Sequence, residues 1–239
     1  MKKTTVTIVI PTYNERENIL FLIPAIKKIE KKLKGYRLEI MVVDDNSPDR
    51  TGTSLRKTYG RDPWVRVIIR KNQRGLGTAI RDGIKAAKGR NIIGMDADFN
   101  HDPGCIPNLL QELNLADLVI CSRFIPGGGM QDKKRYWGTR MFNLLLRTLL
   151  KFPSTDNASG YYAIRAKDLV NLGIGKIYYG YGDYHLRLVY SAKVKGLRIA
   201  ETPVYYGDRR FGTSKSNLLS MSYTYLAEAI RLRFSKNKW

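Results

Sequence analysis

The sequence has little of what marks a disulfide-rich or zinc-binding protein. It contains two cysteines and two histidines in 239 residues. Cys105 and Cys121 have no neighbouring Cys or His pair, which argues against a zinc site and leaves no disulfide framework. A reducing, cytosolic setting is therefore expected.

Long apolar runs are also missing. The stretch from Val6 to Ile10 is short, and Pro11 ends it. A signal peptide needs a longer apolar core, and a membrane-spanning helix needs about 20 apolar residues. We therefore expect neither a signal peptide nor a segment that crosses a membrane.

Acidic residues are half as common as basic ones. Lys and Arg number 42 against 21 Asp and Glu, which gives a net charge of +21 and a pI near 10.0. Such an excess predicts attraction to a polyanion: nucleic acid, anionic lipid or a phosphorylated substrate. An apolar content of 43% and a charged content of 26% are those of an ordinary globular protein, which excludes disorder and collagen-like repeats.

The first half of the chain alternates apolar strands with amphipathic helices. This pattern is typical of a parallel sheet covered on both faces. The predicted strands are Val6 to Ile10, Leu38 to Val43, Val65 to Ile69, Asn91 to Met95 and Leu118 to Cys121.

The second half is less regular. The interval from Arg123 to Gly138 is rich in glycine and basic residues, and we predict a long mobile loop there. After Thr213 the apolar residues fall on one helical face. We therefore divide the chain into a domain over 1–215 and an amphipathic basic tail over 216–239 that lies at an interface or binds a partner. The apolar residues of that tail are Leu219, Tyr223, Leu226, Ile230 and Phe234.

Polar side chains follow the predicted strands where each one ends. Examples are Asp44 and Asp45, Asp96 and Asp98, and Arg123. In an open α/β sheet, ligands bind at the carboxyl ends of the strands. A single such residue is more simply a turn former or a helix cap, but their repetition at one edge favours a ligand site.

Asp96-Ala97-Asp98 is the most informative element. Two carboxylates on alternate residues at a strand end can hold a hard divalent cation, and Mg²⁺ prefers one or two carboxylates plus substrate phosphates. The cation would stabilise a leaving nucleoside diphosphate. Taken alone, such a pair is a weak signal, because caps and turns explain most acidic pairs of this kind.

Two further polar segments lie at the ends of the first two predicted strands, Pro11 to Asn18 and Val42 to Asp49. Tyr13 can stack on a base, and Glu15 and Asp45 can accept hydrogen bonds from a base or ribose. The structural alternative makes Asn14 a helix cap and Ser47-Pro48-Asp49 a turn. The two interpretations are compatible.

These motifs, together with Gly75-Leu76-Gly77-Thr78-Ala79, resemble the family-2 glycosyltransferases, and within them the dolichyl-phosphate mannose synthase group. The resemblance runs from about Val6 to Lys215. It implies a GT-A fold, a Rossmann-like α/β domain with a mostly parallel central sheet flanked by helices. The implied donor is GDP-mannose, the cofactor Mg²⁺ or Mn²⁺, and the acceptor a polyprenyl phosphate such as dolichyl phosphate. The implied donor site consists of Pro11, Tyr13, Glu15, Val43 and Asp45, with Asp96 and Asp98 holding the metal.

The resemblance also assigns basic residues to the acceptor. Guanidinium groups can grip phosphate oxygens in bidentate fashion, and Lys adds a point charge. For Arg135 and Arg140, solvated positions without a catalytic role remain an alternative. The implied catalytic residues are Asp98, Arg123, Arg209 and Lys215, and the implied acceptor phosphate site is Arg123, Arg135, Arg140, Ser214 and Lys215.

The implied reaction is a direct displacement with inversion at the anomeric carbon. A phosphate monoester is ionised near pH 7, so no strong general base is needed, and catalysis consists of positioning and charge neutralisation. For His101 and His185 we expect solvated or structural roles.

One segment departs from the family pattern. Where the family commonly has Phe-Gln-x-Glu, this chain has Tyr184-His185-Leu186-Arg187, which puts the donor-sugar contacts in question. Asp183 is a candidate substitute carboxylate. The family's Asp-x-x-Ser/Thr-Gly stretch is present as Asp156-Asn157-Ala158-Ser159-Gly160. The resemblance implies that this stretch lines the sugar pocket.

The acceptor's isoprenoid stays in a bilayer, so we expect a peripheral protein at the cytoplasmic face of a membrane. Arg140 to Lys151 and Asn217 to Trp239 could lie in the interface, with the net charge adding attraction to anionic headgroups. A separate membrane anchor protein is the other route. For both segments the structural alternative is packing in the core.

Other functions fit less well. A nucleic-acid-binding module would explain the charge but not the acidic strand ends, and no recognition helix or RNA-binding motif is present, so we expect no nucleic-acid partner. A nucleotide-sugar-binding subunit without activity stays possible. A dinucleotide oxidoreductase is excluded because no Gly-x-Gly-x-x-Gly follows the first strand. Transfer of glucose or another hexose, for example from UDP-glucose, to polyprenyl phosphate remains the main alternative.

Overall fold

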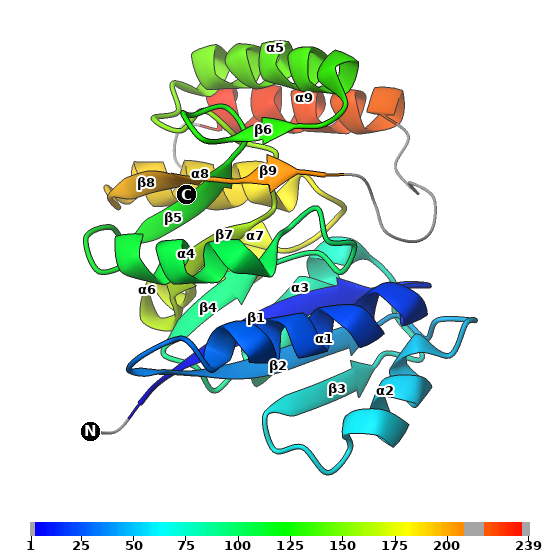
Figure 1. Ribbon diagram of the computed structural model, residues 1–239. Helices are drawn as coiled ribbons and strands as arrows, with labels where there is room; N and C mark the ends of the chain where they lie inside the picture. Colours follow the sequence, from blue (N-terminus) through cyan, green and yellow to red (C-terminus); the bar gives the residue numbers. More distant parts are fainter. Residues whose placement is uncertain (1–2, 208–217, 236–239) are drawn as a thin grey trace.

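A computed structural model describes residues 3–207 and 218–235, with side chains from 221 onward in the second range. Its centre is a seven-stranded sheet in the order β3-β2-β1-β4-β7-β5-β8 (Figure 1). The strands are β1 (Thr4–Thr12), β2 (Tyr36–Asp44), β3 (Val65–Ile69), β4 (Asn91–Gly94), β5 (Leu118–Ser122), β7 (Tyr162–Arg165) and β8 (Ile199–Pro203). The five predicted strands are therefore confirmed, with ends within a few residues of those expected.

All neighbouring strands are parallel except at β7, which runs antiparallel to both β4 and β5. The predicted α/β fold with a mostly parallel sheet is confirmed. Six strands therefore end at one edge of the sheet, and β7 begins there. A small parallel pair, β6 (Gly129–Met130) and β9 (Tyr205–Tyr206), lies beyond this edge.

Helices cover both faces of the sheet, because the central strands bury side chains on both sides. Ile8 and Ile10 of β1 join the core beneath one set of helices, whereas Val9 joins the core on the opposite face. The first core is covered by α1 (Arg16–Glu30), α2 (Thr51–Tyr59) and α4 (Ile106–Glu112), which a short 3-10 turn (Pro103–Cys105) precedes. The second is covered by α3 (Leu76–Ala86), α6 (Ala166–Leu172), α7 (Ile174–Ile177) and α8 (Tyr184–Val194).

The prediction of a long loop from Arg123 to Gly138 is wrong for the last residues of this interval. Helix α5 (Lys133–Leu150) begins within it, and the Asp132 side chain caps the helix by accepting a hydrogen bond of 3.0 Å from Arg135 N–H. The sequence pattern does not indicate this helix start, because the first turns contain charged residues and Gly138, and the apolar face of α5 becomes continuous only further along.

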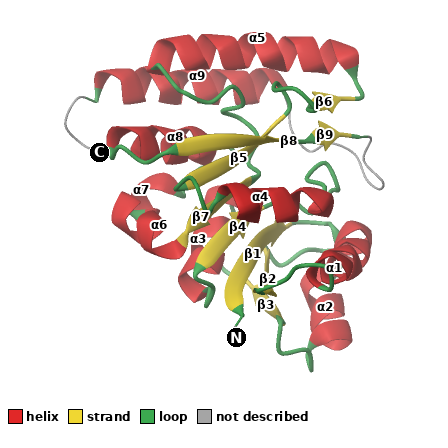
Figure 2. Cartoon of the chain, turned by 60° about the vertical axis from the view of Figure 1, so that its left-hand side comes forward, coloured by secondary structure: helices red, strands yellow, loops and turns green. Residues whose placement is uncertain are grey.

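Helix α9 (Leu218–Phe234) lies alongside α5 at one end of the molecule (Figures 1 and 2). Phe142 of α5 and Tyr225 of α9 meet with ring centroids 6.3 Å apart. The predicted tail helix is confirmed. The apolar face that the sequence predicts for this helix points outward, since Tyr223 and Phe234 are exposed. The side chains that face the core are those of Tyr225 and Leu232.

Among the residues that the structure describes, no helix combines the length and the apolar content that crossing a bilayer requires.

Candidate active site

The ends of β1, β2 and β4 meet at one edge of the sheet. Pro11 stands opposite Val43 in the β1–β2 register. Asp45 N–H donates to Thr12 C=O at 3.1 Å, and Met95 N–H donates to Val9 C=O at 3.2 Å. The residues predicted for the donor nucleotide and those predicted for the metal therefore lie on adjacent strand ends.

Tyr13 and Glu15 occupy the loop between β1 and α1. The Arg74 guanidinium lies 5.2 Å from the centroid of the Tyr13 ring. The Glu15 carboxylate accepts a hydrogen bond of 2.7 Å from the Asn18 side chain. Glu15, and not Asn14, stands at the N-cap of α1, and Asn14 has a left-handed backbone with φ of 54°. The alternative assignment of Asn14 as the cap is thus wrong.

Two neighbouring aspartates at the end of β2 have different surroundings. Asp44 accepts hydrogen bonds from Thr12 Oγ1 at 3.0 Å and from both Ser47 N–H and Oγ. Ser47 C=O accepts from Arg50 N–H at 3.0 Å, so the predicted turn after β2 is confirmed. Asp44 therefore fixes the backbone of this turn.

Asp45 instead forms a buried ion pair with Arg70. Arg70 Nε lies 2.7 Å from Asp45 Oδ1, while Gly75 N–H donates to Oδ2 at 2.8 Å. Arg70 also donates to Thr78 Oγ1 at 2.9 Å and to Gly75 C=O at 2.9 Å. One arginine thus ties the end of β2 to the glycine turn before α3.

Arg70 was not among the site residues predicted from the sequence. It follows Ile69 directly, at the end of β3, and so obeys the rule that polar residues at strand ends gather at one edge. That position was the available indication.

The loop after β4 carries the predicted metal ligands. The Asp96 side chain is 45% exposed, whereas Asp98 is nearly buried. Asn100 donates to Asp98 from its N–H at 3.2 Å and from its side chain at 3.0 Å. Phe99 between them has φ of 63°, a conformation that bulky residues rarely adopt. The loop is therefore held in one shape by several contacts.

These side chains fit a divalent cation whose coordination shell is completed by oxygen atoms of a bound substrate. Within the described residues, no group of three or more His, Cys, Asp or Glu side chains could enclose a metal. Two carboxylates on one loop are instead the donor set that Mg²⁺ uses when phosphate oxygens and water supply the other ligands.

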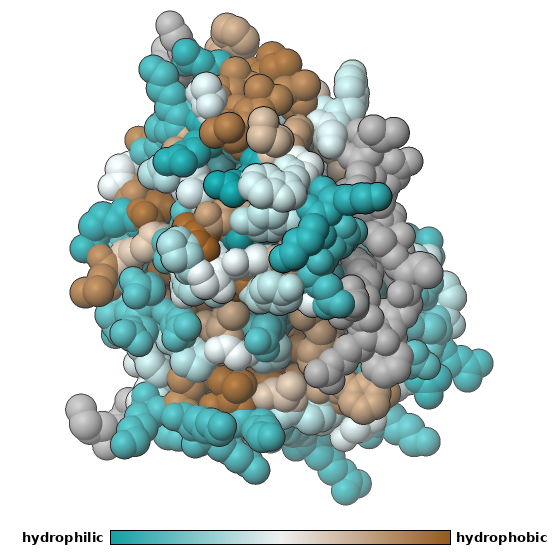
Figure 3. All heavy atoms as spheres, turned by 45° about the horizontal axis from the view of Figure 1, so that its top comes forward, coloured by the Kyte–Doolittle hydropathy of each residue, from teal (hydrophilic) through white to brown (hydrophobic). Residues whose placement is uncertain are grey.

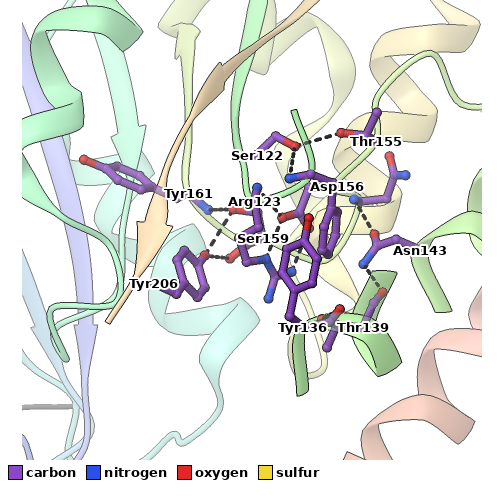
Figure 4. A network of polar contacts seen from close by, with 12 residues as sticks. Ser122, Arg123, Tyr136, Thr139, Asn143, Thr155, Asp156, Ser159, Tyr161 and Tyr206 are labelled. Atoms are coloured by element: carbon purple, nitrogen blue, oxygen red, sulfur yellow. Dashed lines mark hydrogen bonds and ion pairs between the residues drawn. The ribbon is translucent and has the colours of Figure 1, made fainter. Parts of the chain in front are cut away.

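The end of β5 carries a second buried ion pair (Figure 4). Arg123 donates from Nε to Asp156 Oδ2 at 2.6 Å and from Nη2 to Oδ1 at 2.7 Å. Its guanidinium lies 4.8 Å from the centroid of the Tyr206 ring. Burial disfavours the charged form of Arg123, but the Asp156 carboxylate more than offsets this, so the pKa of Arg123 lies above its ordinary value.

Helix α5 supports this pair from the side. Asn143 on α5 accepts a hydrogen bond of 2.6 Å from Asn157 N–H, next to Asp156. Asn143 donates in turn to Thr139 C=O at 2.9 Å within the helix (Figure 4). Asp156 was expected to line a sugar pocket, and its carboxylate binds Arg123.

The other predicted acceptor residues are less closely grouped. Arg135 is half-buried in the first turn of α5, and the guanidinium of exposed Arg140 lies 5.1 Å from the centroid of the Trp137 ring. In the described part of the chain, neither forms a hydrogen bond or ion pair with Arg123 or Asp156. Arg209, Ser214 and Lys215 lie outside the described residues.

A comparison with known families gives a match over residues 7–173, to the model described as glycosyl transferase family 2. The chain belongs to this family.

Curated relatives within this family are identical to the chain at about a third of the aligned positions. Dolichol-phosphate mannosyltransferase of Pyrococcus furiosus is 32% identical over 232 residues, which cover 95% of this chain and 63% of that protein. Undecaprenyl-phosphate mannosyltransferase of Micrococcus luteus is 33% identical, over 87% of this chain and 85% of that protein. Polyprenol monophosphomannose synthase of Mycolicibacterium smegmatis is 30% identical, over 96% and 88%.

Solved structures agree on the fold. Glucosyl-3-phosphoglycerate synthase from Mycobacterium tuberculosis, in complex with Mn²⁺, UDP-glucose and phosphoglyceric acid, superposes with a TM-score of 0.69 at 21% identity. The match covers 96% of this chain and 80% of that chain. The family-2 chain thus has the GT-A fold expected from its motifs.

The segment that departs from the family pattern has a structural explanation. Arg187 is fully buried, and its guanidinium pairs with Asp183 and with Glu228 of α9, the latter at 3.2 Å. It also donates to Ile177 C=O at 2.8 Å and lies 3.6 Å from the centroid of the Tyr179 ring. In this family-2 chain the position therefore joins α8 to α9, and the Asp183 carboxylate is held by Arg187 and by Tyr181 N–H at 3.0 Å.

His185, the neighbouring departure, is also buried. Neither ring nitrogen has a hydrogen-bond partner among the described residues. Burial lowers its pKa to about 4, since the Asp156 carboxylate opposes the shift only in part and His101 and Arg123 add to it. The structural roles expected for both histidines agree with their burial, although neither is solvated.

Proposed function

We propose that the protein transfers mannose from GDP-mannose to dolichyl or another polyprenyl phosphate, with inversion at the anomeric carbon. The observation that carries this proposal is the convergence of the donor motif and the Asp96–Asp98 loop at one edge of the sheet, beside the Arg123–Asp156 pair. The names of the relatives, each a mannose transferase or synthase for a polyprenol or its phosphate, supply the substrate class.

On the donor side, Pro11, Tyr13, Glu15, Val43 and Asp45 hold the nucleotide. The half-buried Tyr13 ring offers a face to the base. Arg70 and Gly75 keep the Asp45 carboxylate in one orientation, and the proposal assigns its remaining acceptor capacity to the ribose or the base.

Asp96 and Asp98 hold Mg²⁺ or Mn²⁺. When bound, the cation neutralises the charge that develops on the departing diphosphate. The fold neighbour was solved in complex with Mn²⁺ and UDP-glucose, which supports a dependence on a divalent metal.

On the acceptor side, Arg123 orients the phosphate monoester. Its Nε and Nη2 are used by Asp156, so the proposal assigns Nη1 to the acceptor. Arg135, Arg140, Arg209, Ser214 and Lys215 contribute further positive charge and donors, as the family motif implies. The ionised phosphate attacks directly, and no side chain has to remove a proton.

The acceptor lipid brings the protein to a membrane surface, and we propose that α5 and α9 form the contact, with residues 216–239 as an interfacial tail on the 1–215 domain. Several large apolar side chains are exposed here together. Figure 3, which brings this end forward, shows a hydrophobic patch bordered by hydrophilic side chains. The exposed apolar residues are Trp137, Met141, Leu144 and Leu145 on α5 and Tyr223, Ile230 and Phe234 on α9. A membrane anchor protein on the same patch is the alternative.

The test is transfer by the purified protein. Labelled GDP-mannose, a polyprenyl phosphate and Mg²⁺ should give label that extracts into organic solvent, with parallel reactions containing labelled UDP-glucose. Label from UDP-glucose alone would replace mannose by glucose in the assignment. Absence of transfer from either donor, in protein that binds both GDP and Mn²⁺, would favour a binding subunit.

Asp98→Asn should reduce this transfer by at least about 100-fold, because it removes one of only two metal-binding carboxylates. The matched control is Asp168→Asn on α6, at the opposite edge of the sheet, which should transfer at the wild-type rate. Full turnover by Asp98→Asn would remove the metal assignment.

A further inference from the structure

His101 lies between the two halves of the site and bonds to both. Its Nδ1 atom accepts a hydrogen bond of 2.7 Å from the backbone N–H of Asp96. Its Nε2 atom lies 3.0 Å from the carbonyl oxygen of Ser159, 58 residues further along the chain, and 3.7 Å from Asp96 Oδ2, which is beyond hydrogen-bond distance. The imidazole therefore links the metal-binding loop after β4 to the loop before β7.

These two partners fix the tautomer. A backbone N–H only donates and a carbonyl oxygen only accepts, so Nδ1 carries no hydrogen and Nε2 carries one. The ring is also held from its face, because Tyr161 stacks on it at 4.8 Å with an angle of 13° between the planes. His101 is buried and is thus locked in position, orientation and tautomer.

The Ser159 carbonyl continues the link toward the acceptor side. It also accepts a hydrogen bond of 3.2 Å from the Tyr206 hydroxyl. The Tyr206 ring packs against the Arg123 guanidinium, which Asp156 binds. One connected set of contacts thus runs from the backbone of Asp96, through His101, to Arg123 (Figure 4 shows its acceptor half).

We propose that His101 is a positioning residue that sets Asp96 for the metal through Nδ1 and sets the acceptor-side loop through Nε2–H. The proposal rests on the function proposed above. It gives the imidazole two separable tasks, one for each ring nitrogen.

Two substitutions separate these tasks. In His101→Asn, the amide oxygen replaces Nδ1 and can still accept from Asp96 N–H, but nothing reaches Ser159. In His101→Gln, the amide nitrogen replaces Nε2 and can still donate to Ser159 C=O, but the acceptor for Asp96 N–H is lost. Tyr161→Phe is the control, since it keeps the stacked ring and removes only the hydroxyl contact to Asp102 C=O.

Two quantities are measured for each protein. Binding of Mn²⁺ in the presence of GDP is followed by the loss of the free-ion electron paramagnetic resonance signal, and the KM for polyprenyl phosphate is measured separately. We expect His101→Gln to weaken Mn²⁺ binding about tenfold and to leave the acceptor KM within about threefold. We expect His101→Asn to do the reverse, and Tyr161→Phe to change neither.

A purely structural role predicts a different pattern. If both His101 variants weaken both quantities to the same extent, in proportion to a fall in melting temperature, the proposal is wrong. It is also wrong if neither variant changes either quantity.

A measurement on the wild-type protein covers the case in which the variants do not fold. Long-range nitrogen–proton NMR should show His101 as the tautomer with hydrogen on Nε2. A hydrogen on Nδ1 would overturn the proposal. Failure of the proposed function is a separate result, namely wild-type protein that binds no Mn²⁺ with GDP, and the tautomer still decides the role of His101.

Discussion

The buried Arg187 side chain is surrounded by charged and polar partners. Asp183, Glu228 and two backbone carbonyls surround it. Glu228 is in turn held by Arg231, whose Nε lies 2.8 Å from the Glu228 carboxylate. Burial opposes ionisation of Glu228, but these arginines hold its pKa below the ordinary value. A charge that would be costly alone is thus neutralised within the interface of α8 and α9.

Removing this guanidinium should be strongly destabilising. Arg187→Met leaves the Asp183 carboxylate without its cation and leaves Glu228 with Arg231 alone. Breaking such a buried pair costs about 3 kcal/mol or more. The free energy of unfolding in urea measures the effect. Arg198→Met is the matched control, because Arg198 pairs with Asp117 while 64% exposed, and an exposed pair contributes little to stability. Equal losses in the two variants would contradict this account of Arg187.

His185 should make the folded protein sensitive to acid. Its pKa is about 4 in the folded state and near 6.5 when unfolded. As pH falls through 6.5, the unfolded chain binds a proton that the folded chain does not, so stability decreases until about pH 4. This group alone accounts for about 3 kcal/mol over that interval.

His185→Gln, which carries no titratable group, should lose that part of the pH dependence. Urea unfolding at several pH values between 4 and 7 gives the slope for each protein. The two slopes should converge above pH 7. Identical slopes throughout would show that His185 is not buried in its neutral form.

At the scale of elements, the close contact between α3 and the α7–α8 loop holds the glycine turn before α3 in place. Gly77 N–H donates to Gly180 C=O at 3.1 Å. A Cβ atom at Gly77 would lie 2.5 Å from the Tyr179 carbonyl oxygen, which is backbone and cannot rotate away. The same loop carries Asp183, so the glycine turn beside Asp45 is supported by the α8–α9 end of the molecule.

Gly77→Ala should therefore cost about 2 kcal/mol of stability and weaken GDP binding, because the turn has to move away from Tyr179. Calorimetric melting and nucleotide titration measure the two effects. Gly138→Ala offers a control inside α5, where a Cβ meets nothing within 4 Å and the better helix former should add about 0.5–1 kcal/mol. A neutral Gly77→Ala would show that α3 can shift without cost.

On the scale of the whole molecule, exposed apolar side chains gather at one end, on α5 and α9. The chain as a whole carries a net charge of +21. Flotation with vesicles rich in anionic lipid should therefore retain the protein, and about 1 M salt should release much of it. Leu144→Glu on α5 should reduce this retention at least severalfold.

The matched variant for that experiment is Leu115→Glu, which changes an exposed leucine just after α4 and should float as the wild type does. Retention that depends on neither salt nor lipid charge would instead favour a protein anchor on the α5–α9 surface.

The position of the site was predictable because it follows from chain order. Strands with near-continuous apolar character are typical of a parallel sheet covered on both faces, and the ends of parallel strands share an edge. Pro11, Val43, Asp45 and Asp96 could be grouped on this basis alone. The beginning of α5 could not be predicted, because its first turns carry charges and a glycine in place of an apolar face.

The sequence by itself determined five of the seven strands, the edge at which the site lies and the membership of the family, since all three depend on local patterns and short motifs. It did not show β7 and β8, or that β7 runs antiparallel to its neighbours. Only the tertiary structure decided which charges meet. Arg70 with Asp45, Arg123 with Asp156, Arg187 with Glu228 and His101 with Ser159 are pairs between distant segments. Whether a charged side chain binds a ligand, a neighbour or water depends on how those segments pack, and no local pattern encodes that.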